Sequence, residues 1–516
     1  MNVFIYLIAR VFRIRIISDN WRNRFILLRV FWQVTDFHYD VNYSSTGDPN
    51  NMCHQDDVTF NATGSYGNYL CDSPWQLISS AIEAMYKIKP DPDFIIWTGD
   101  SVPHVPESDL DLDKVYTLIG NITDEIIRVF PNTSLFPVLG NHDPFPSNQM
   151  PYDVENNRYY KDILNVSNWN IVLRANESKQ FQHGGYYSSQ ISKKFRLIGL
   201  NTNLYYDQDK LTRDLDDPAN QFAWLKDELE GARKRQEAVY IIAHVPPGSF
   251  ELGTGLGWFY DKYNRRYLDL LEEYSDVIMA QMYGHEHTDS FRVQLDAEGK
   301  PINTLFLCPA VTPWKSSLPG VGANNPSVRL YKYDRDTAIP QSYTQYYLNL
   351  TRANLKGNAD NWEKEYDTSD VYAIDQLTPT ALHGLARGFG DKSNKVFLSY
   401  LEFNSVMWDT SHECNDTCFI HHYCAITQLD YGQFNACLAG DGRLTTISPT
   451  DTTRHHSRRP TVPAQVPSYL YYVMGGLAVL LFVLFLVVAV MCFRRGNFRS
   501  FRVPKYSKFG SLSVNS

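Results

Sequence analysis

Short apolar runs alternate with longer amphipathic segments between about residues 31 and 310. A helix is predicted from Ser73-Pro74-Trp75, with Ser73 as the cap and an apolar face at Leu77, Ile78, Ala81, Ile82 and Met85, and a second helix at 112–130. Runs of strand length occur at 31–35, 94–97, 135–139, 195–200, 239–243, 277–283 and 304–307. Strands that alternate with helices in this way predict an α/β core.

The pattern changes after about residue 340. The segments 346–355, 362–366 and 379–388 are predicted to be helical, and a cluster of cysteines ends this region. The stretch 441–468 is rich in Thr, Ser, Pro and Arg without apolar periodicity, which is typical of a stalk. We therefore expect a poorly defined N-terminus at 1–30, the main α/β domain at 31–335, a small helical C-terminal subdomain at 336–440 and a stalk at 441–468.

An uncharged apolar segment follows at 469–493. About 20 apolar residues suffice to cross a bilayer, so this segment predicts one transmembrane helix. Basic residues come next (Arg494, Arg495, Arg499, Arg502, Lys505 and Lys508), which places a tail at 494–516 in the cytosol. A removable lipid-anchor signal is the alternative, but such a signal ends in its apolar tail. The expectation is a single-pass type I membrane protein with its main domain extracellular or in the lysosomal lumen.

Glycosylation sequons support a secretory location. They begin at Asn42, Asn61, Asn121, Asn132, Asn165, Asn176, Asn349 and Asn415, all before the apolar segment. The start is less regular, because Arg10, Arg13 and Arg15 interrupt the first apolar stretch. Either the signal is atypical, or residues 1–30 are unreliable.

Cysteine usage agrees with an oxidising compartment. Cys53 and Cys71 form one candidate pair, and Cys414, Cys418, Cys424 and Cys437 form a cluster. Together they suggest three disulfides. A structural zinc site that uses His421 and His422 with the cluster is the alternative, and the sequon at Asn415 argues against it. The net charge of −9 argues against double-stranded nucleic acid as a partner. The sequence does not predict the oligomeric state.

Five polar motifs stand at or just after predicted strands. They comprise Asp36 and His38; Gly99-Asp100; Gly140-Asn141-His142-Asp143; His244; and Gly284-His285-Glu286-His287. In an extended segment, residues two apart point to the same face, so each Asp-x-His or His-x-His pair converges on one point. The glycines before Asp100, Asn141 and His285 let the backbone approach a crowded centre closely.

Two carboxylates, one amide and several imidazoles suit a pair of divalent ions. Zinc accepts imidazole nitrogen and carboxylate oxygen, and two adjacent ions can clamp the attacking and leaving oxygens of a phosphoryl group. Each motif alone is more often an ordinary turn or a core histidine. The ordered set at strand ends predicts hydrolysis of a phosphate ester.

Longer strings narrow the comparison. The order of the motifs resembles the calcineurin-like metallophosphoesterases. The strings 98–105 (TGDSVPHV), 140–146 (GNHDPFP), 310–314 (AVTPW) and 345–350 (QYYLNL) resemble the acid sphingomyelinase-like phosphodiesterases. The resemblance covers about 31–440. It implies a sandwich of two mixed β-sheets flanked by helices, and the disulfide pairs Cys53–Cys71, Cys414–Cys418 and Cys424–Cys437.

The resemblance also implies roles for the motif residues. Asp36, His38 and His287 are expected to bind one Zn²⁺, and Asn141, His244 and His285 a second. Asp100 is expected to bridge the two ions. His142 and His104 are expected near the leaving-group oxygen, where an imidazole donates a proton or stabilises negative charge.

Two departures limit the resemblance. Acid sphingomyelinase carries a lipid-loading saposin domain, and the residues before Phe31 have neither the length nor the cysteines for one. Relatives are secreted or lipid-anchored, whereas a transmembrane helix is predicted here. The expected function is a zinc-dependent phosphodiesterase that hydrolyses small phosphodiesters or nucleotides by attack of a metal-activated hydroxide on phosphorus. The alternatives are a phosphodiesterase that acts on membrane sphingomyelin and a non-catalytic membrane scaffold.

Overall fold

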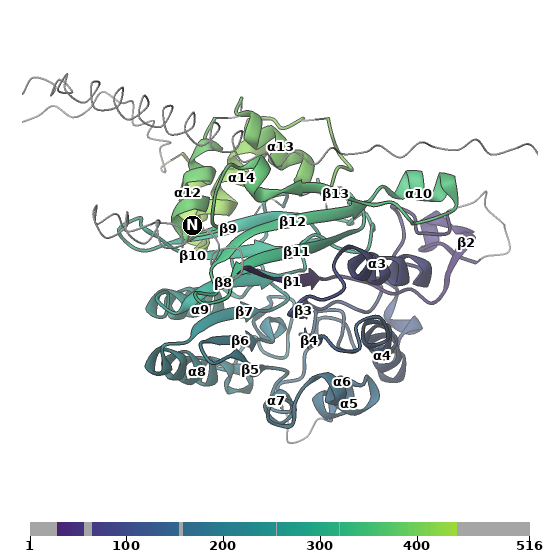
Figure 1. The fold of residues 1–516 in the computed structure, drawn as a ribbon, viewed down its shortest axis with the longest axis horizontal. Helices are drawn as coiled ribbons and strands as arrows, with labels where there is room; N and C mark the ends of the chain where they lie inside the picture. Colours follow the sequence, from purple (N-terminus) through teal and green to yellow (C-terminus); the bar gives the residue numbers. More distant parts are fainter. Residues whose placement is uncertain are drawn as a thin grey trace, which may run out of the picture. The chain divides into compact units, whose positions relative to one another are not determined.

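Two six-stranded β-sheets form the centre of the molecule (Figure 1). The computed structural model describes residues 28–440 except 56–63, 154–157, 254, 319, 392 and 412. The first sheet has the order β13 (Trp362–Asp367), β12 (Pro340–Leu348), β11 (Ser327–Asp334), β1 (Leu28–Val34), β3 (Phe94–Trp97) and β4 (Ser134–Pro137). The second has the order β5 (Tyr187–Ser192), β6 (Phe195–Gly199), β7 (Ala238–Ile242), β8 (Ile278–Tyr283), β10 (Pro301–Leu307) and β9 (Ser290–Leu295). A separate short strand, β2, spans Tyr43–Asp48.

Both sheets are mixed, as the sequence predicts. In the first, β1, β3 and β4 run parallel, while β11, β12 and β13 continue the sheet antiparallel. In the second, β6, β7, β8 and β10 run parallel, and β5 and β9 pair antiparallel at the edges. Parallel neighbours end at the same edge of a sheet. The loops that follow β1, β3 and β4, and those that follow β7 and β8, therefore start from common edges.

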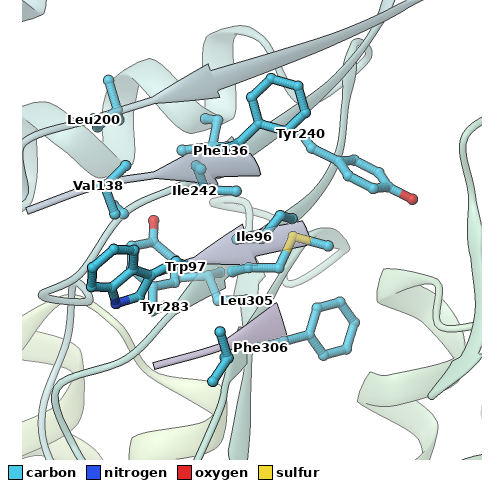
Figure 2. Packing of buried hydrophobic residues seen from close by; sticks show 14 of the residues in the cluster. Ile96, Trp97, Phe136, Val138, Leu200, Tyr240, Ile242, Tyr283, Leu305 and Phe306 are labelled. Atoms are coloured by element: carbon cyan, nitrogen blue, oxygen red, sulfur yellow. The ribbon is translucent and has the colours of Figure 1, made fainter. Parts of the chain in front are cut away.

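Aromatic side chains fill the space between the sheets. Phe31 of the first sheet contacts Tyr240 of the second, with ring centroids 5.8 Å apart, and Phe94 contacts Phe195 at 6.2 Å. Figure 2 shows Phe136 and Ile96 of the first sheet packed near Ile242 of the second. Fully burying each such side chain stabilises the folded state by roughly 1.5–3 kcal/mol. The apolar runs read from the sequence thus face one another across a shared core.

Helices lie on the outside of the two sheets (Figure 1). Near the first sheet and its connections are α3 (Trp75–Ile88), α4 (Leu112–Val129), α5 (Tyr159–Val166), α6 (Trp169–Val172), α10 (Leu350–Lys356) and α11 (Thr368–Val371), whereas α7 (Ala175–Phe181) contacts β5 of the second sheet. The others are α8 (Gln221–Arg235), α9 (Asp261–Glu273), α12 (Pro379–Gly388), α13 (Lys395–Asn404), α14 (Asp416–Thr427) and α15 (Tyr431–Leu438). Single 3₁₀ turns occur at Pro49–Asn51, Glu107–Asp109, Thr202–Tyr205 and Pro218–Asn220. α12 and α14 contact β9, which places the cysteine-rich region against the second sheet.

Three local predictions need correction. Ser73 does not cap α3, since Pro74 is the residue at the N-cap and makes no side-chain bond there. The helix predicted at 346–355 begins only at Leu350, where the Asn349 side chain accepts from the Arg352 amide, and the residues before it belong to β12. The helix predicted at 362–366 is strand β13. Aromatic residues fit a pleated, half-buried surface, and pairing with a neighbouring strand overrides weak helical periodicity.

The membrane-spanning part of the prediction is also corrected. Among the helices within the described residues, none is both long enough and apolar enough to cross a bilayer. The segment predicted to do so, 469–493, lies outside those residues, as do the stalk and the tail. The predicted fold class and the predicted type I membrane localisation both included that helix. The fold that the structure supports is a mixed α/β fold with two sheets.

The disulfides have the pairings that the resemblance implied. Cys53–Cys71, Cys414–Cys418 and Cys424–Cys437 are bonded, and Cys308 is a buried free thiol. The zinc alternative for the cysteine cluster is therefore wrong, because disulfide sulfurs are not thiolate ligands. None of the sequon asparagines that the structure describes is buried, and Asn61 lies outside the described residues.

A buried arginine joins the sheets to the C-terminal region. Arg329 on β11 is fully buried; its Nη1 donates to the Leu307 carbonyl at the end of β10 (3.0 Å), and its Nη2 lies 2.6 Å from Asp289 Oδ1. The other Asp289 oxygen accepts from the Tyr366 hydroxyl on β13 at 2.6 Å. One ion pair thus connects three segments that are distant in sequence.

We predict that Arg329→Met destabilises the protein strongly. The substitution leaves the Asp289 carboxylate buried and unpaired, and breaking a buried pair in this way costs about 3–5 kcal/mol. Differential scanning calorimetry should show a lowered Tm. The matched control is Arg265→Met, because Arg265 pairs with Asp261 at an exposed surface and its loss should change Tm little. Equal effects of the two substitutions would contradict the assignment.

Candidate metal centre

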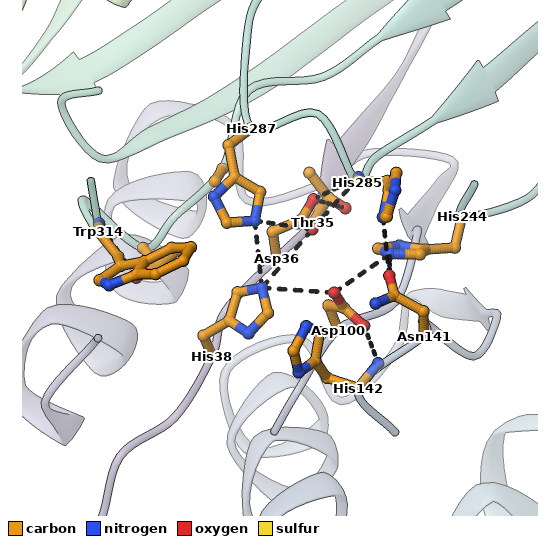
Figure 3. Close-up of polar contacts among 12 residues, drawn as sticks. Thr35, Asp36, His38, Asp100, Asn141, His142, His244, His285, His287 and Trp314 are labelled. Carbon is orange, nitrogen blue, oxygen red and sulfur yellow. Dashed lines mark hydrogen bonds and ion pairs between the residues drawn. The ribbon is translucent and has the colours of Figure 1, made fainter. Parts of the chain in front are cut away.

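The structure brings all the predicted metal ligands to one place (Figure 3). They follow the strands of both sheets: Asp36 and His38 after β1, Asp100 after β3, Asn141 after β4, His244 after β7, and His285 and His287 after β8. The loops are also joined through their backbones, since the Asp36 amide donates to Gly99 O (3.0 Å) and the Gly284 amide to His244 O (3.1 Å). The site therefore lies where the two sheets meet at their carboxyl ends.

The backbone at the site is turned rather than extended. Asp36, His38 and Asp100 have φ values of 50°, 42° and 55°, and His285 and His287 have values of 73° and 60°. Positive φ is uncommon in residues other than glycine and costs of order 1–3 kcal/mol at each position. The sequence predicted that residues two apart converge because the segment is extended. That reason is wrong, because the backbone is turned at these residues. The pairs do converge, but through left-handed turns.

Two glycines make the close approach possible. A Cβ on Gly140 would lie 2.0 Å from Asp100 Oδ1, and a Cβ on Gly284 would lie 2.6 Å from Asp36 Oδ2. Any side chain at either position would displace a carboxylate of the centre. The role predicted for these glycines is confirmed.

The first group of donors comprises Asp36, His38 and His287, with Asp100 beside them. His38 Nε2 lies 3.2 Å from His287 Nε2 and 3.4 Å from Asp100 Oδ2, and His287 Nε2 lies 3.4 Å from Asp36 Oδ1. His38 Nδ1 is 2.7 Å from the Val102 carbonyl, to which it donates, so in the neutral ring Nε2 carries the free lone pair. Several electron-pair donors thus face one small space.

The second group comprises Asn141, His244 and His285, again with Asp100. Asn141 Oδ1 lies 2.9 Å from His244 Nε2 and 2.7 Å from His285 Nδ1. His244 Nδ1 donates to the Thr98 carbonyl at 2.7 Å, so its Nε2 is also an acceptor in the neutral ring. Two acceptors in contact repel each other unless a cation or a proton lies between them.

Asp100 connects the two groups. Its Oδ2 lies 3.4 Å from His38 Nε2 and 3.2 Å from His244 Nε2, while its Oδ1 accepts from the His142 amide at 2.8 Å. Ligands at 2.0–2.1 Å from a tetrahedral ion are separated by about 3.3–3.4 Å, and most of these contacts are close to that value. The residues present therefore fit two divalent ions that share the Asp100 carboxylate.

The electrostatics of the site also favour cations. Burial acts to raise the pKa of Asp36, but hydrogen bonds from His287 and His38 outweigh it and hold the pKa well below the usual range. Burial acts to lower the pKa of His38 and of His244, but the adjacent carboxylates Asp36 and Asp100 raise each pKa to about 9. Without metal, protons on these rings balance the carboxylates. A metal ion must displace those protons, so metal binding competes with acid.

His104 and His142 lie beside the first group. The His104 and His142 ring centroids are 4.4 Å apart, and the His104 ring lies 4.0 Å from that of His38. The His104 side chain is 15% exposed, and both histidines line a cleft of about 1040 Å³. His104 is also close enough to His38 and His287 to share an ion with them, so geometry alone leaves a ligand role open for it.

Glu286 stands between His285 and His287 in the sequence, and its side chain is buried. Its carboxylate pairs with buried Arg292 (2.9 Å) and accepts from Trp258 Nε1 (2.9 Å). The Trp258 ring in turn packs against His285, with centroids 4.4 Å apart. These contacts hold the loop that presents His285 and His287. The sequence motifs do not predict these contacts, because Arg292 and Trp258 belong to none of them.

The C-terminal region forms one wall of the cleft. Its contribution includes Trp408, Asn415 and His421, and the loop at 314–324 forms the neighbouring edge. The polar and charged residues of this wall include Lys315, Ser316, Asp409, Glu413, Thr417 and His422. The metal ligands and the distant wall of the cleft thus come from different parts of the chain.

Comparison with protein families agrees with this arrangement. Residues 29–289 match the family model described as calcineurin-like phosphoesterase, and residues 300–443 match the acid sphingomyelin phosphodiesterase C-terminal region. The two matches cover the metal ligands and the cysteine-rich wall of the cleft, respectively.

Similar curated proteins cover most of the chain. It is 40% identical to acid sphingomyelinase-like phosphodiesterase 3b of Mus musculus, over 80% of this chain and 90% of that protein. It is 42% identical to cyclic GMP-AMP phosphodiesterase SMPDL3A of Bos taurus, over 79% and 90%. It is 35% identical to sphingomyelinase phosphodiesterase C of Dictyostelium discoideum, over 79% and 92%. The chain therefore belongs to the acid sphingomyelinase-like phosphodiesterases of the calcineurin-like phosphoesterase family.

Proposed function

We propose that this phosphodiesterase uses two zinc ions. Asp36, His38 and His287 would hold one, and Asn141, His244 and His285 the other. The observation that carries the proposal is the position of Asp100, whose Oδ2 lies within 3.4 Å of one histidine from each group. Mixed imidazole and carboxylate donors suit zinc better than magnesium or calcium, which prefer oxygen ligands alone. Two such ions supply Lewis acidity and lower the pKa of a bound water.

His142 and His104 are the groups proposed to assist the leaving oxygen. The His142 amide is fixed by Asp100 Oδ1, which places this imidazole at the edge of the centre. The His104 ring lies 4.4 Å from the His142 ring, and both side chains line the cleft. An imidazole that donates a proton to a leaving alkoxide contributes typically about 10²–10⁴-fold to the rate. The proton would pass from a ring nitrogen to the ester oxygen as its bond to phosphorus breaks.

Small phosphodiesters or nucleotides are the proposed substrates. The cleft has the volume of a site for a ligand of nucleotide size or larger. Trp258, Trp314 and Trp408 line it and provide aromatic rings on which a base can stack, and Lys315 adds a positive charge to the same lining. Relatives from Bos taurus, Homo sapiens, Rattus norvegicus and Mus musculus are named for cyclic GMP-AMP, which is a soluble phosphodiester.

Sphingomyelin remains the alternative substrate, because a relative from Dictyostelium discoideum is named for it. A non-catalytic scaffold is disfavoured by the donor set. All the predicted ligands are present and converge, which a binding protein without catalysis would not need.

Removal of metal should abolish activity. We expect the full-length protein to contain two zinc ions by mass spectrometry. Dialysis against a chelator should lower hydrolysis of bis(p-nitrophenyl) phosphate by at least about 100-fold, with recovery on addition of zinc. Asp100→Asn should lose metal without a chelator. Full activity in metal-free protein would contradict the proposal.

Substitution of His104 or His142 should lower the turnover number and leave the zinc content unchanged. We predict that His104→Ala and His142→Ala retain zinc but lose about 10²–10⁴-fold in kcat on a diester with an alkoxide leaving group. The loss should be much smaller with p-nitrophenolate, which leaves without a proton. His183→Ala is the matched control, because His183 is exposed at the end of α7. A variant of His104 that loses zinc would instead show that His104 is a ligand.

Substrate preference should separate the two candidate classes. We expect kcat/KM for cyclic GMP-AMP to exceed that for detergent-dispersed sphingomyelin by at least about tenfold, a difference of about 1.4 kcal/mol in transition-state stabilisation. The measurement is product release from both substrates with the same zinc-loaded enzyme. The opposite order would favour the lipid.

A further inference from the structure

We propose that Asp72 is the positioning residue of His104. The inference rests on the proposed function, because it concerns the histidine assigned to the leaving group. Asp72 precedes α3 in the segment Cys71-Asp72-Ser73-Pro74, which matched no motif. The structure places its fully buried carboxylate beside His104, a residue 32 positions later.

The carboxylate holds both the backbone and the ring of His104. Asp72 Oδ2 accepts from the His104 amide at 2.6 Å, and both carboxylate oxygens lie 3.1 Å from His104 Nδ1. Thr312 donates its hydroxyl to Asp72 Oδ1 at 3.0 Å, which orients the carboxylate. With Nδ1–H directed to Asp72, the other ring nitrogen, Nε2, is left for the leaving-group oxygen.

The two faces of the ring are also occupied. Trp314 stacks on His104 with centroids 3.8 Å apart and an interplanar angle of 18°, and His38 stacks at 4.0 Å and 29°. Two nearly parallel rings at these separations must lie on opposite faces of the imidazole. In Figure 3, Trp314 lies beyond His38 and His287 at the edge of the centre. Stacking fixes the plane of the ring, while Asp72 decides which of its edges faces the cleft.

The segment that carries Asp72 is itself tied to the metal loops. Cys71 is bonded to Cys53, and the Ser73 amide donates to the His38 carbonyl at 3.1 Å. The Asp40 amide donates to the Ser73 carbonyl at 3.0 Å. The carboxylate is therefore fixed relative to both His38 and His104. A hydrogen-bonded carboxylate behind a catalytic imidazole selects its tautomer and orientation, as in the serine protease triad.

The first test is Asp72→Asn in the full-length, zinc-loaded protein. The amide nitrogen cannot accept, so a single oxygen remains for the His104 amide and ring, and the negative charge beside Nδ1 is lost. We expect kcat on a diester with an alkoxide leaving group to fall about 10- to 100-fold, with KM and zinc content unchanged. Activity on bis(p-nitrophenyl) phosphate should fall much less. A merely structural defect would lower both activities together.

The matched control is Asp40→Asn. Asp40 is 2% exposed, belongs to the adjoining loop and pairs with His54 at 2.7 Å, but it makes no contact with His104 among the described interactions. Its variant should keep the wild-type dependence on the leaving group. Thr312→Val, which retains the Asp72 carboxylate but removes one of its donors, gives a milder test and should show a smaller loss with the same dependence.

A double-mutant cycle separates positioning from independent action. Because Asp72 acts through His104, Asp72→Asn combined with His104→Ala should be no slower than His104→Ala alone. Losses that multiply would overturn the inference, as would wild-type kinetics in Asp72→Asn. If the wild-type protein hydrolysed no phosphodiester, the proposed function itself would fail. If only the inference about Asp72 were wrong, the wild-type protein would still show zinc-dependent hydrolysis of phosphodiesters.

Discussion

The structure depends on the burial of two carboxylates, Asp36 and Asp100, where the two sheets meet. An isolated buried carboxylate is very costly unless positive charge or hydrogen bonds surround it. Here the surrounding groups are imidazoles, held so that their lone pairs face the same space as the carboxylate oxygens. Without metal, the carboxylates are balanced only if the histidine rings are protonated and buried in the charged form. Two divalent ions would accept the lone pairs of the carboxylates and of the neutral rings together. The same arrangement that makes the apo centre unfavourable makes it a metal site.

Convergence of these donors requires backbone that most residues avoid. Asp36, His38 and Asp100 all have positive φ, and no local interaction of these residue types favours that conformation strongly enough to hold it alone. The strain is held by its surroundings: a core of aromatic rings between the sheets, hydrogen bonds between the metal loops, and anchors such as Arg292 behind Glu286. The strained backbone of the site thus requires the rigid, well-packed scaffold around it. Glycine at 140 and 284 removes the atoms that would otherwise separate the loops.

Sequence patterns predicted the buried parallel strands and the polar residues that converge at the candidate centre, because both rest on local signals. Apolar runs such as 94–97 have the length of a buried strand, and each ligand motif follows such a run directly. The end of β12 and all of β13 were predicted to be helical, because their conformation is decided by the pairing of β12 with β11 and of β13 with β12 rather than by their own residues. The turned backbone at Asp36 and the contact of Asp72 with His104 are non-local in the same sense. The predicted domain boundary at 335 and the individual ligand roles stay predictions.

The division of the chain also bears on how the substrate is chosen. The proposed metal ligands and the two histidines proposed to assist the leaving group come from 36–287, whereas the far wall of the cleft comes from 314–324 and from the region after 400. Changes in that wall can alter which diester fits without disturbing the ions or Asp100. The motifs therefore indicate the type of reaction, whereas the residues of the wall would determine which substrate fits. Because His104 stacks on Trp314, a residue of the wall segment, and on the ligand His38, it is the point where the two parts meet. A substrate that displaced Trp314 would therefore move the stacked His104 ring before it disturbed the proposed metal ligands.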